Sequence, residues 1–213
     1  GPVQFRFALG NSLNVPAVKM LALVGIKDVL KTATDLGITT LPPTQETLNR
    51  VGLSLTLGGG EVRLIDMTDA FSAFVNKGMR IDPIAILKVT DINGKVLEET
   101  KLEKGKKVLT EEQAFMIADI LSDNNARKDI FGPNSLLNIM GKKVMVKTGT
   151  TNDKRDNWTI GGTSSAMVGV WVGNNDNSEM LNVASGVSGA SPIWRRILLE
   201  AVSGKADKGF ETP

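Results

Sequence analysis

The residues best suited to chemistry form the run Lys147-Thr148-Gly149-Thr150-Thr151, which directly follows an apolar, strand-like segment. A lysine at a strand end places a cation at the edge of a cleft, and threonine hydroxyls beside it can hold a carboxylate. Gly149 lets a ligand approach the backbone closely, and the N–H that follows can stabilise an oxyanion. Taken alone, the same run also fits an ordinary strand end with a polar turn.

A second polar group, Ser12-Leu13-Asn14, stands just before a helix that we expect to start at Pro16. A serine hydroxyl and an asparagine amide two residues apart can face one cleft from a loop. There they could relay a proton and hold a substrate amide. The alternative interpretation is that Ser12 or Asn14 is only a helix cap.

The residue types that the chain lacks exclude several classes of catalytic and metal site. The chain contains no Cys, no His and no Tyr, which excludes a cysteine nucleophile, a Ser-His-Asp triad and a His-ligated zinc site within it. A phosphate-binding loop fails because Val146 stands where glycine should precede the lysine. Asp153, Asp156 and Asp176 lack the register of a calcium loop. We therefore expect covalent chemistry by an activated Ser or Thr, and neither a metal nor a cofactor.

The overall composition indicates a globular domain rather than a nucleic-acid or membrane protein. Hydrophobic residues make up 41% of the 213 positions, which suffices for a packed core. The formal net charge is +2, too small to attract nucleic acid or an anionic membrane. No apolar run reaches the roughly 18 residues that would indicate a membrane span, so we expect no membrane contact within this chain.

The elements that must position these groups follow from hydrophobic periodicity and turn signals. Helices are expected at 17–23, 26–36 and 62–75, from a Thr110–Gln113 capping box through the apolar run 115–121 to near Ser122, and from Ser191-Pro192 to about 202. A β-hairpin is expected over 84–99, with a two-residue type I′ turn at Asn93-Gly94. Three further strands are expected at 143–147, 157–161 and 166–173, as an antiparallel meander covered by the last helix. This pattern predicts the α+β class.

Together the two polar groups and their surroundings resemble the transpeptidase domain of class A penicillin-binding proteins. The signatures of this family are Ser-x-x-Lys, a Ser-x-Asn type triplet and Lys-Thr-Gly. The matching segments are 1–3, 8–18, 59–62, 71–78, 147–153, 155–156, Trp158, 169–174, 184–186, 189–190 and 192–194. The resemblance covers residues 1 to about 202, and two motifs in family-like order and spacing make it specific.

The resemblance implies a β-lactamase/transpeptidase-like fold, incomplete here, with helices packed on an antiparallel sheet. It implies a peptidoglycan D,D-transpeptidase that cross-links D-Ala-D-Ala stem peptides and binds β-lactams. By position, Ser12 relays a proton, Asn14 holds the substrate amide and Lys147 supplies positive potential. Thr148 and Thr150 grip the terminal carboxylate, and Gly149 lets the substrate approach the backbone. The location it implies is the extracytoplasmic face of the bacterial membrane, with the parent protein anchored by an upstream segment.

One family signature is missing: no Ser-x-x-Lys occurs anywhere in the 213 residues. We therefore interpret residues 1–213 as the C-terminal part of one transpeptidase domain, with its core at about 1–203 and a tail at 204–213. We expect this chain alone to be inactive. Because sheet strands would be missing as well, we also expect an exposed apolar edge and self-association. The alternatives are a non-catalytic binding or scaffold module with the same fold, and a β-lactam-hydrolysing enzyme.

Overall fold

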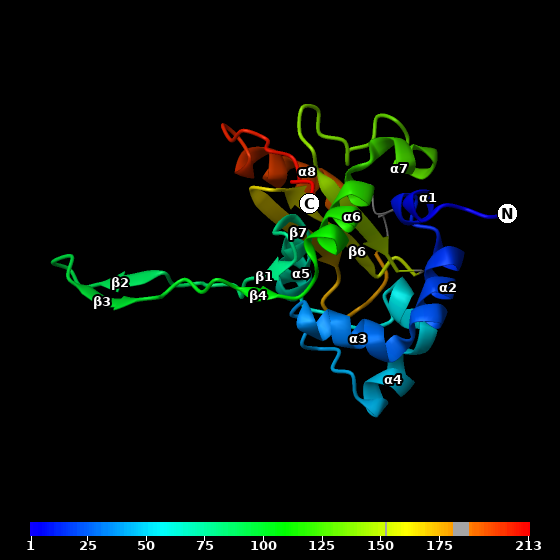
Figure 1. Ribbon diagram of the computed structural model, residues 1–213, viewed down its shortest axis with the longest axis horizontal. Helices are drawn as coiled ribbons and strands as arrows, with labels where there is room; N and C mark the ends of the chain where they lie inside the picture. Colours follow the sequence, from blue (N-terminus) through cyan, green and yellow to red (C-terminus); the bar gives the residue numbers. More distant parts are fainter. Residues whose placement is uncertain (152, 181–187) are drawn as a thin grey trace.

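The computed structural model describes residues 1–151, 153–180 and 188–213 (Figure 1). The resembling segment 184–186 therefore lies outside the described residues. The helices are α1 Phe5–Gly10, α2 Asn14–Val24, α3 Ile26–Asp35, α4 Gln45–Val51, the 3₁₀ helix η1 Gly52–Leu57, α5 Leu64–Val75, α6 Glu111–Ser122, α7 Asn124–Phe131 and α8 Ala190–Ala201. The strands are β1 Met79–Arg80, β2 Lys88–Thr90, β3 Val96–Glu99, β4 Lys106–Lys107, β5 Met145–Thr150, β6 Asp156–Thr163 and β7 Ala166–Gly173. The predicted α+β class is confirmed.

The centre of the molecule is an antiparallel sheet in the order β5-β6-β7, the meander expected from the sequence. Successive side chains on a strand point to opposite faces. Val146 accordingly joins the core beneath α8, together with Trp194 and Leu198. Met145 joins the core on the other face, beneath α5 and α6, with Ala118. Helices thus cover both faces of the sheet, and β5 lies at one of its edges (Figure 1).

A separate helical layer carries the N-terminal third of the chain. Its core joins α3, α4 and α5 and is built around Leu30, Leu41, Val51 and Ala73, all of which are buried. The chain passes through α1 and α2 before it enters this layer (Figure 1). The turn between α1 and α2 lies close to the edge of the sheet, where Lys147 of β5 donates a hydrogen bond to Ser12.

Several local predictions are confirmed. The Thr110 hydroxyl accepts from the Gln113 N–H at the start of α6, the Gln113 side chain reciprocates, and the helix ends at Ser122 as expected. Helix α3 ends within one residue of its predicted end, and Gly37 follows with φ +104°. Strand β7 has the predicted bounds. These features depend on contacts within a few residues, which the sequence displays directly.

Other boundaries were wrong. Strand β5 continues to Thr150 instead of stopping at Lys147, because its pairing with β6 continues to Asn157. Lys147 is therefore an internal strand residue and not a strand end. Helix α2 begins at Asn14 with Leu13 as its N-cap, so neither Ser12 nor Asn14 is the cap. Helix α8 begins at Ala190 behind Gly189 rather than at Ser191-Pro192. The helices α1, α4 and α7 and the 3₁₀ helix η1 were not predicted.

The hairpin of β2 and β3 projects far from the rest of the molecule (Figure 1). Its turn is not the predicted type I′, because only Gly94 of the pair Asn93-Gly94 has a positive φ. The Asp91 carboxylate instead accepts from the N–H groups of Asn93 and Lys95, and the Gly94 N–H donates to the Asp91 carbonyl. This is a three-residue turn with glycine in the left-handed position.

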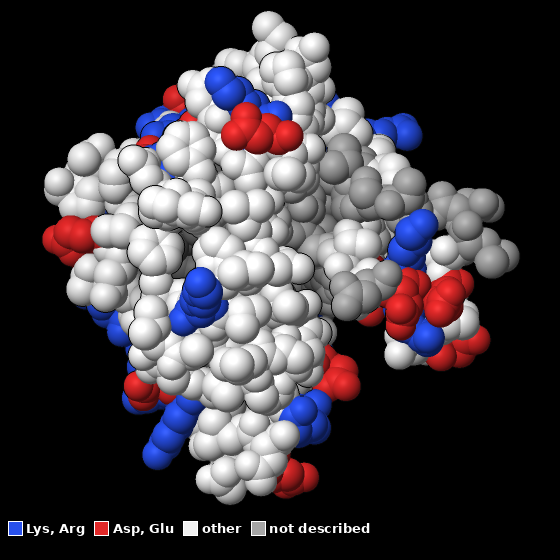
Figure 2. Space-filling model, turned by 90° about the vertical axis from the view of Figure 1, so that its right-hand side faces the viewer, with Lys and Arg blue, Asp and Glu red and all other residues white. Residues whose placement is uncertain are grey.

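The surface carries charges of both signs. On the face shown in Figure 2, Lys and Arg are mixed with Asp and Glu over a largely uncharged surface. Among the described residues, no helix is long and apolar enough to cross a membrane. The segment 204–213 forms no helix or strand, yet Phe210 packs near α6 and Asp207 accepts from the Lys143 N–H. The expected self-association stays a prediction.

Candidate active site

Ser12 and Lys147, 135 residues apart in the chain, meet in the folded protein. The Lys147 ammonium donates to the Ser12 hydroxyl at 2.7 Å and to the backbone carbonyl of Thr148 at 2.6 Å. Ser12 lies in the turn between α1 and α2, whereas Lys147 lies within β5. The loop before a helix and a strand thus form two walls of one site, with a cation shared between them.

The register of β5 leaves backbone groups free beside this lysine. The Thr151 N–H donates to the Asp156 carbonyl at 3.1 Å, so the neighbouring pair Thr150–Asn157 exchanges no backbone hydrogen bonds. The N–H groups of Thr148 and Thr150 therefore point away from β6, toward the edge where the sheet has no further strand among the described residues. An N–H in this position can stabilise a developing oxyanion.

The side chains of Thr148 and Thr150 share one face of β5, since they are two residues apart. Thr150 is exposed and Thr148 half-buried. Gly149 stands between them, and a Cβ added there would meet only the Trp158 Cβ, at an ordinary contact distance of 3.7 Å. The fold itself has room for a larger residue at Gly149. Any requirement for glycine must come from what binds along this edge.

The turn that presents Ser12 is backbone-strained and firmly anchored. Ser12 has φ +58°, a left-handed conformation that is unfavourable for a residue with a Cβ. Next to it, the buried Asn11 side chain donates to the Ala126 carbonyl at 2.6 Å and accepts from the Ile130 N–H at 3.1 Å. Asn11 thereby ties the turn to α7 through both ends of its amide.

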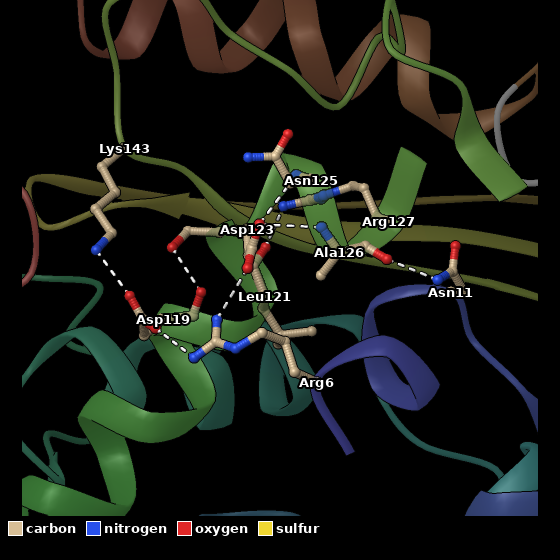
Figure 3. Close-up of polar contacts among 10 residues, drawn as sticks. Arg6, Asn11, Asp119, Leu121, Asp123, Asn125, Ala126, Arg127 and Lys143 are labelled. Atoms are coloured by element: carbon tan, nitrogen blue, oxygen red, sulfur yellow. Dashed lines mark hydrogen bonds and ion pairs between the residues drawn. The ribbon is translucent and has the colours of Figure 1, made fainter. Parts of the chain in front are cut away.

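A charged network holds α1 against α6 and α7 (Figure 3). Arg6 on α1 pairs with Asp119 at 2.8 Å and with Asp123 at 3.1 Å, and Lys143 pairs with Asp119 from the other side at 2.9 Å. Burial alone would raise the pKa of Asp119, but hydrogen bonds from Lys143 and Arg6 outweigh it and lower the pKa. Asp123 also caps α7 by accepting from the Asn125 and Ala126 N–H groups. The network fixes the helix that carries the Ser12 turn relative to β5.

Arg127 on α7 lies buried behind the lysine. Its guanidinium donates to the carbonyls of Leu121 and, at 3.4 Å, Val146, the residue before Lys147. The Val146 carbonyl belongs to the same open edge as the Thr148 carbonyl, so Arg127 and Lys147 satisfy consecutive edge carbonyls. Burial lowers the pKa of Arg127 to about 10, partly offset by Asp123, which leaves the guanidinium charged at neutral pH.

Burial, with a smaller contribution from the charge of Arg127, lowers the pKa of Lys147 to about 8 from the ordinary value of 10.5. Desolvation disfavours an ammonium, and a nearby cation disfavours it further. Lys147 is therefore mostly protonated at pH 7 and is half neutral near pH 8. Such a group can act as a cation or exchange a proton with Ser12 near physiological pH.

We expect this shift to appear in two measurements on the chain. After reductive methylation with ¹³C-formaldehyde, the NMR signal that is absent from the Lys147→Arg variant should titrate near pH 8. The folded chain releases this proton near pH 8 and the unfolded chain near pH 10.5, so the free energy of unfolding should rise with pH between these values. Lys147→Met should lack that rise. A Lys147 signal that titrates near 10.5 would contradict the assignment.

One candidate residue, Asn14, remains to be placed, and three residues near the site were not predicted. Asn14 is exposed, and within the described ranges its side chain makes no hydrogen bond, so the structure does not join it to Ser12 or Lys147. The sequence analysis assigned no role to Asn11, Arg127 or the buried Asn157 of β6. Among the described residues, no cluster of acidic side chains could hold a metal. The roles assigned to Ser12, Asn14, Lys147, Thr148, Gly149 and Thr150 remain predictions.

Comparison with known protein families shows extensive similarity. Residues 1–198 match the family model described as "Penicillin binding protein transpeptidase domain". The chain is 31% identical over 217 residues to penicillin-binding protein 1A of Aquifex aeolicus, covering 100% of this chain and 28% of that protein. It is 33% identical over 221 residues to penicillin-binding protein 2D of Bacillus subtilis, covering 100% of this chain and 30% of that protein. The chain thus spans less than a third of the length of these relatives.

Solved structures show the same fold. The penicillin-binding protein PonA1 of Mycobacterium tuberculosis superposes with a TM-score of 0.85 at 24% identity, covering 100% of this chain and 60% of that one. Penicillin-binding protein 1A of Haemophilus influenzae gives a TM-score of 0.83 at 24% identity, covering 100% of this chain and 36% of that one. PonA1 has also been solved in complex with penicillin V. At this identity the likeness establishes the fold alone.

Proposed function

This chain belongs to the penicillin-binding protein transpeptidase domain family, and from that premise we propose that it is the C-terminal part of a serine D,D-transpeptidase domain. In the complete domain it cross-links D-Ala-D-Ala stem peptides of peptidoglycan and is acylated by β-lactams. The reaction takes place on the extracytoplasmic side of the bacterial membrane. The observation that carries the proposal is the 2.7 Å contact between the Lys147 ammonium and the Ser12 hydroxyl.

The proposed reaction is an acyl transfer in two steps. A serine from a Ser-x-x-Lys segment, which these 213 residues lack, gives its hydroxyl proton to a neighbouring basic group and forms a bond to the carbonyl carbon of the penultimate D-Ala. The C–N bond to the terminal D-Ala breaks, and the departing amine takes up a proton through Ser12. An amine of a second stem peptide then attacks the acyl-serine ester; the ester bond breaks, the proton that the amine loses returns to the serine oxygen, and the cross-link forms.

Residues of this chain bind the substrate and adjust the charge. Thr148 and Thr150 hydroxyls donate to the terminal carboxylate, and Lys147 adds positive potential beside them. The outward N–H of Thr150 donates to the attacked carbonyl oxygen as negative charge develops on it. Asn14, at the first position of α2, holds the substrate amide. Burial supports the role of Lys147, because a partly desolvated charge acts more strongly than a solvated one.

Labelling with a fluorescent penicillin tests this proposal. The 213-residue chain alone should form no covalent adduct, since no Ser-x-x-Lys occurs in it. The protein encoded by the whole reading frame should contain that motif and should be labelled at its serine, as shown by intact-mass and peptide spectrometry. An acylated 213-residue chain would show that the nucleophile lies elsewhere. A whole protein without the motif that still binds penicillin reversibly would favour a non-catalytic binding module.

A further inference from the structure

Asn157 is a polar residue with no exposed surface, and the roles assigned above do not use it. It lies on β6 directly opposite Thr150 of β5, in a pair without backbone hydrogen bonds. Side chains of such pairs approach most closely. The Asn157 amide nitrogen donates to the Thr150 hydroxyl oxygen at 3.1 Å. On its other side, the amide oxygen accepts from the backbone N–H of Ala190 at 2.7 Å, at the start of α8.

The Ala190 contact fixes which way the amide points. A backbone N–H can only donate, so the oxygen of Asn157 must face α8 and its NH₂ group must face Thr150. The Thr150 hydroxyl therefore accepts from Asn157 and cannot use this partner for its own proton. Within the part of the chain that the structure describes, this hydroxyl makes no other hydrogen bond. Thr150 is exposed, so its proton is left to point into the site.

We propose that Asn157 is a positioning residue that makes the Thr150 hydroxyl a hydrogen-bond donor, so that the site selects ligands ending in a carboxylate. The inference rests on the proposed function, because it takes Thr150 as a contact of the substrate's carboxylate. A carboxylate only accepts hydrogen bonds, whereas a terminal amide also presents donors. A hydroxyl that is held as a donor therefore favours the carboxylate, and α8 transmits this orientation through Asn157.

The substitution Asn157→Asp tests this orientation with little change in shape. The introduced carboxylate can still accept from the Ala190 N–H, and negative charge is favourable at the start of a helix. In the ionised form its second oxygen, however, can only accept, so the Thr150 hydroxyl must turn its proton toward that oxygen and away from the ligand. Asn157→Ala is the milder variant, since it removes the donor and leaves the hydroxyl free to rotate.

Binding of N-acetyl-D-alanyl-D-alanine and of its C-terminal amide to the 213-residue chain can be followed by ¹H–¹⁵N NMR titration. The wild-type chain should bind the carboxylate form about tenfold or more tightly than the amide. Asn157→Asp should abolish this preference, and Asn157→Ala should reduce it to an intermediate value. If Asn157→Asp fails to fold, the reduced preference for the carboxylate in Asn157→Ala tests the inference instead.

Thr159→Val is the matched control. The Thr159 hydroxyl joins the same strand to the same helix through Ser191 at 2.9 Å, but Thr159 lies opposite Thr148 and not Thr150. This variant should keep the preference for the carboxylate. If both Asn157 variants keep the wild-type preference for the carboxylate within twofold, the inference is overturned and the proposed function stays intact. The same holds if Thr159→Val loses this preference as strongly as the Asn157 variants do. A wild-type chain with no preference would overturn both.

Discussion

Replacing Lys147 by alanine in a protein that contains the complete transpeptidase domain should slow acylation by a penicillin by about 10²–10⁴-fold, the usual contribution of a proton-transferring or charge-stabilising group. The reason is geometric. Lys147 supplies the hydrogen bond to Ser12 and the positive charge beside Thr148, and the structure shows no second cation donating to either group within its described ranges. Stopped-flow or gel-based acylation kinetics measure the effect.

Two further variants show what kind of contribution Lys147 makes. Lys128→Ala removes the same charge from the exposed surface of α7 and should leave the acylation rate within about twofold. Lys147→Arg keeps the positive charge but releases its proton far less readily. A rate close to that of wild type in Lys147→Arg would assign an electrostatic role, whereas a loss as large as in Lys147→Ala would assign proton exchange. Unchanged kinetics in Lys147→Ala would contradict both roles.

Ser12 is expected to give the second large effect, and its backbone provides an unusually clean test. Ser12→Ala and Ser12→Gly both remove the hydroxyl that accepts from Lys147, so both should slow acylation by about 10²-fold or more. Alanine keeps the cost of φ +58° at this position, while glycine adopts that angle freely. Ser12→Gly should therefore melt at the same or a higher temperature than Ser12→Ala, yet be equally slow.

The comparison separates loss of chemistry from loss of structure. If the slow step reflected a disordered turn, glycine and alanine would differ in rate as they differ in stability. Ser54→Ala serves as a control, because the Ser54 hydroxyl of η1 donates to the Val51 carbonyl, three residues earlier in the chain. Acylation by either Ser12 variant at the wild-type rate would show that this hydroxyl carries no proton.

The fold was predictable where short-range contacts determine it. The Thr110 capping box and the Gly37 helix stop act within a few residues, so the sequence displays them. The end of β5 was not predictable in this way, because pairing with β6 extends the strand through a polar run. The hairpin turn was misassigned because the Asp91 carboxylate favours a different turn from the one that Asn93-Gly94 alone suggests.

The site was predictable only in part, for a related reason. Ser12 and Lys147 were identified by motif and spacing, and the structure brings them together. Asn11 and Asn157 were not identified, because the contacts that bury them, with Ala126 and Ala190, lie 115 and 33 residues away in the sequence. A polar residue at an inward-facing strand position was the available signal for Asn157, since a buried amide requires partners. For Asn11, the signal was its place directly before a candidate catalytic serine.

The central claim is that one edge of β5 and the α1–α2 turn hold a ligand's carboxylate. A crystal structure of the complete domain acylated by a penicillin tests it most directly. We expect the penicillin carboxylate within about 3 Å of the Thr148 and Thr150 hydroxyls, with Lys147 between them and Ser12. A carboxylate bound elsewhere, with these hydroxyls still facing water, would contradict the account.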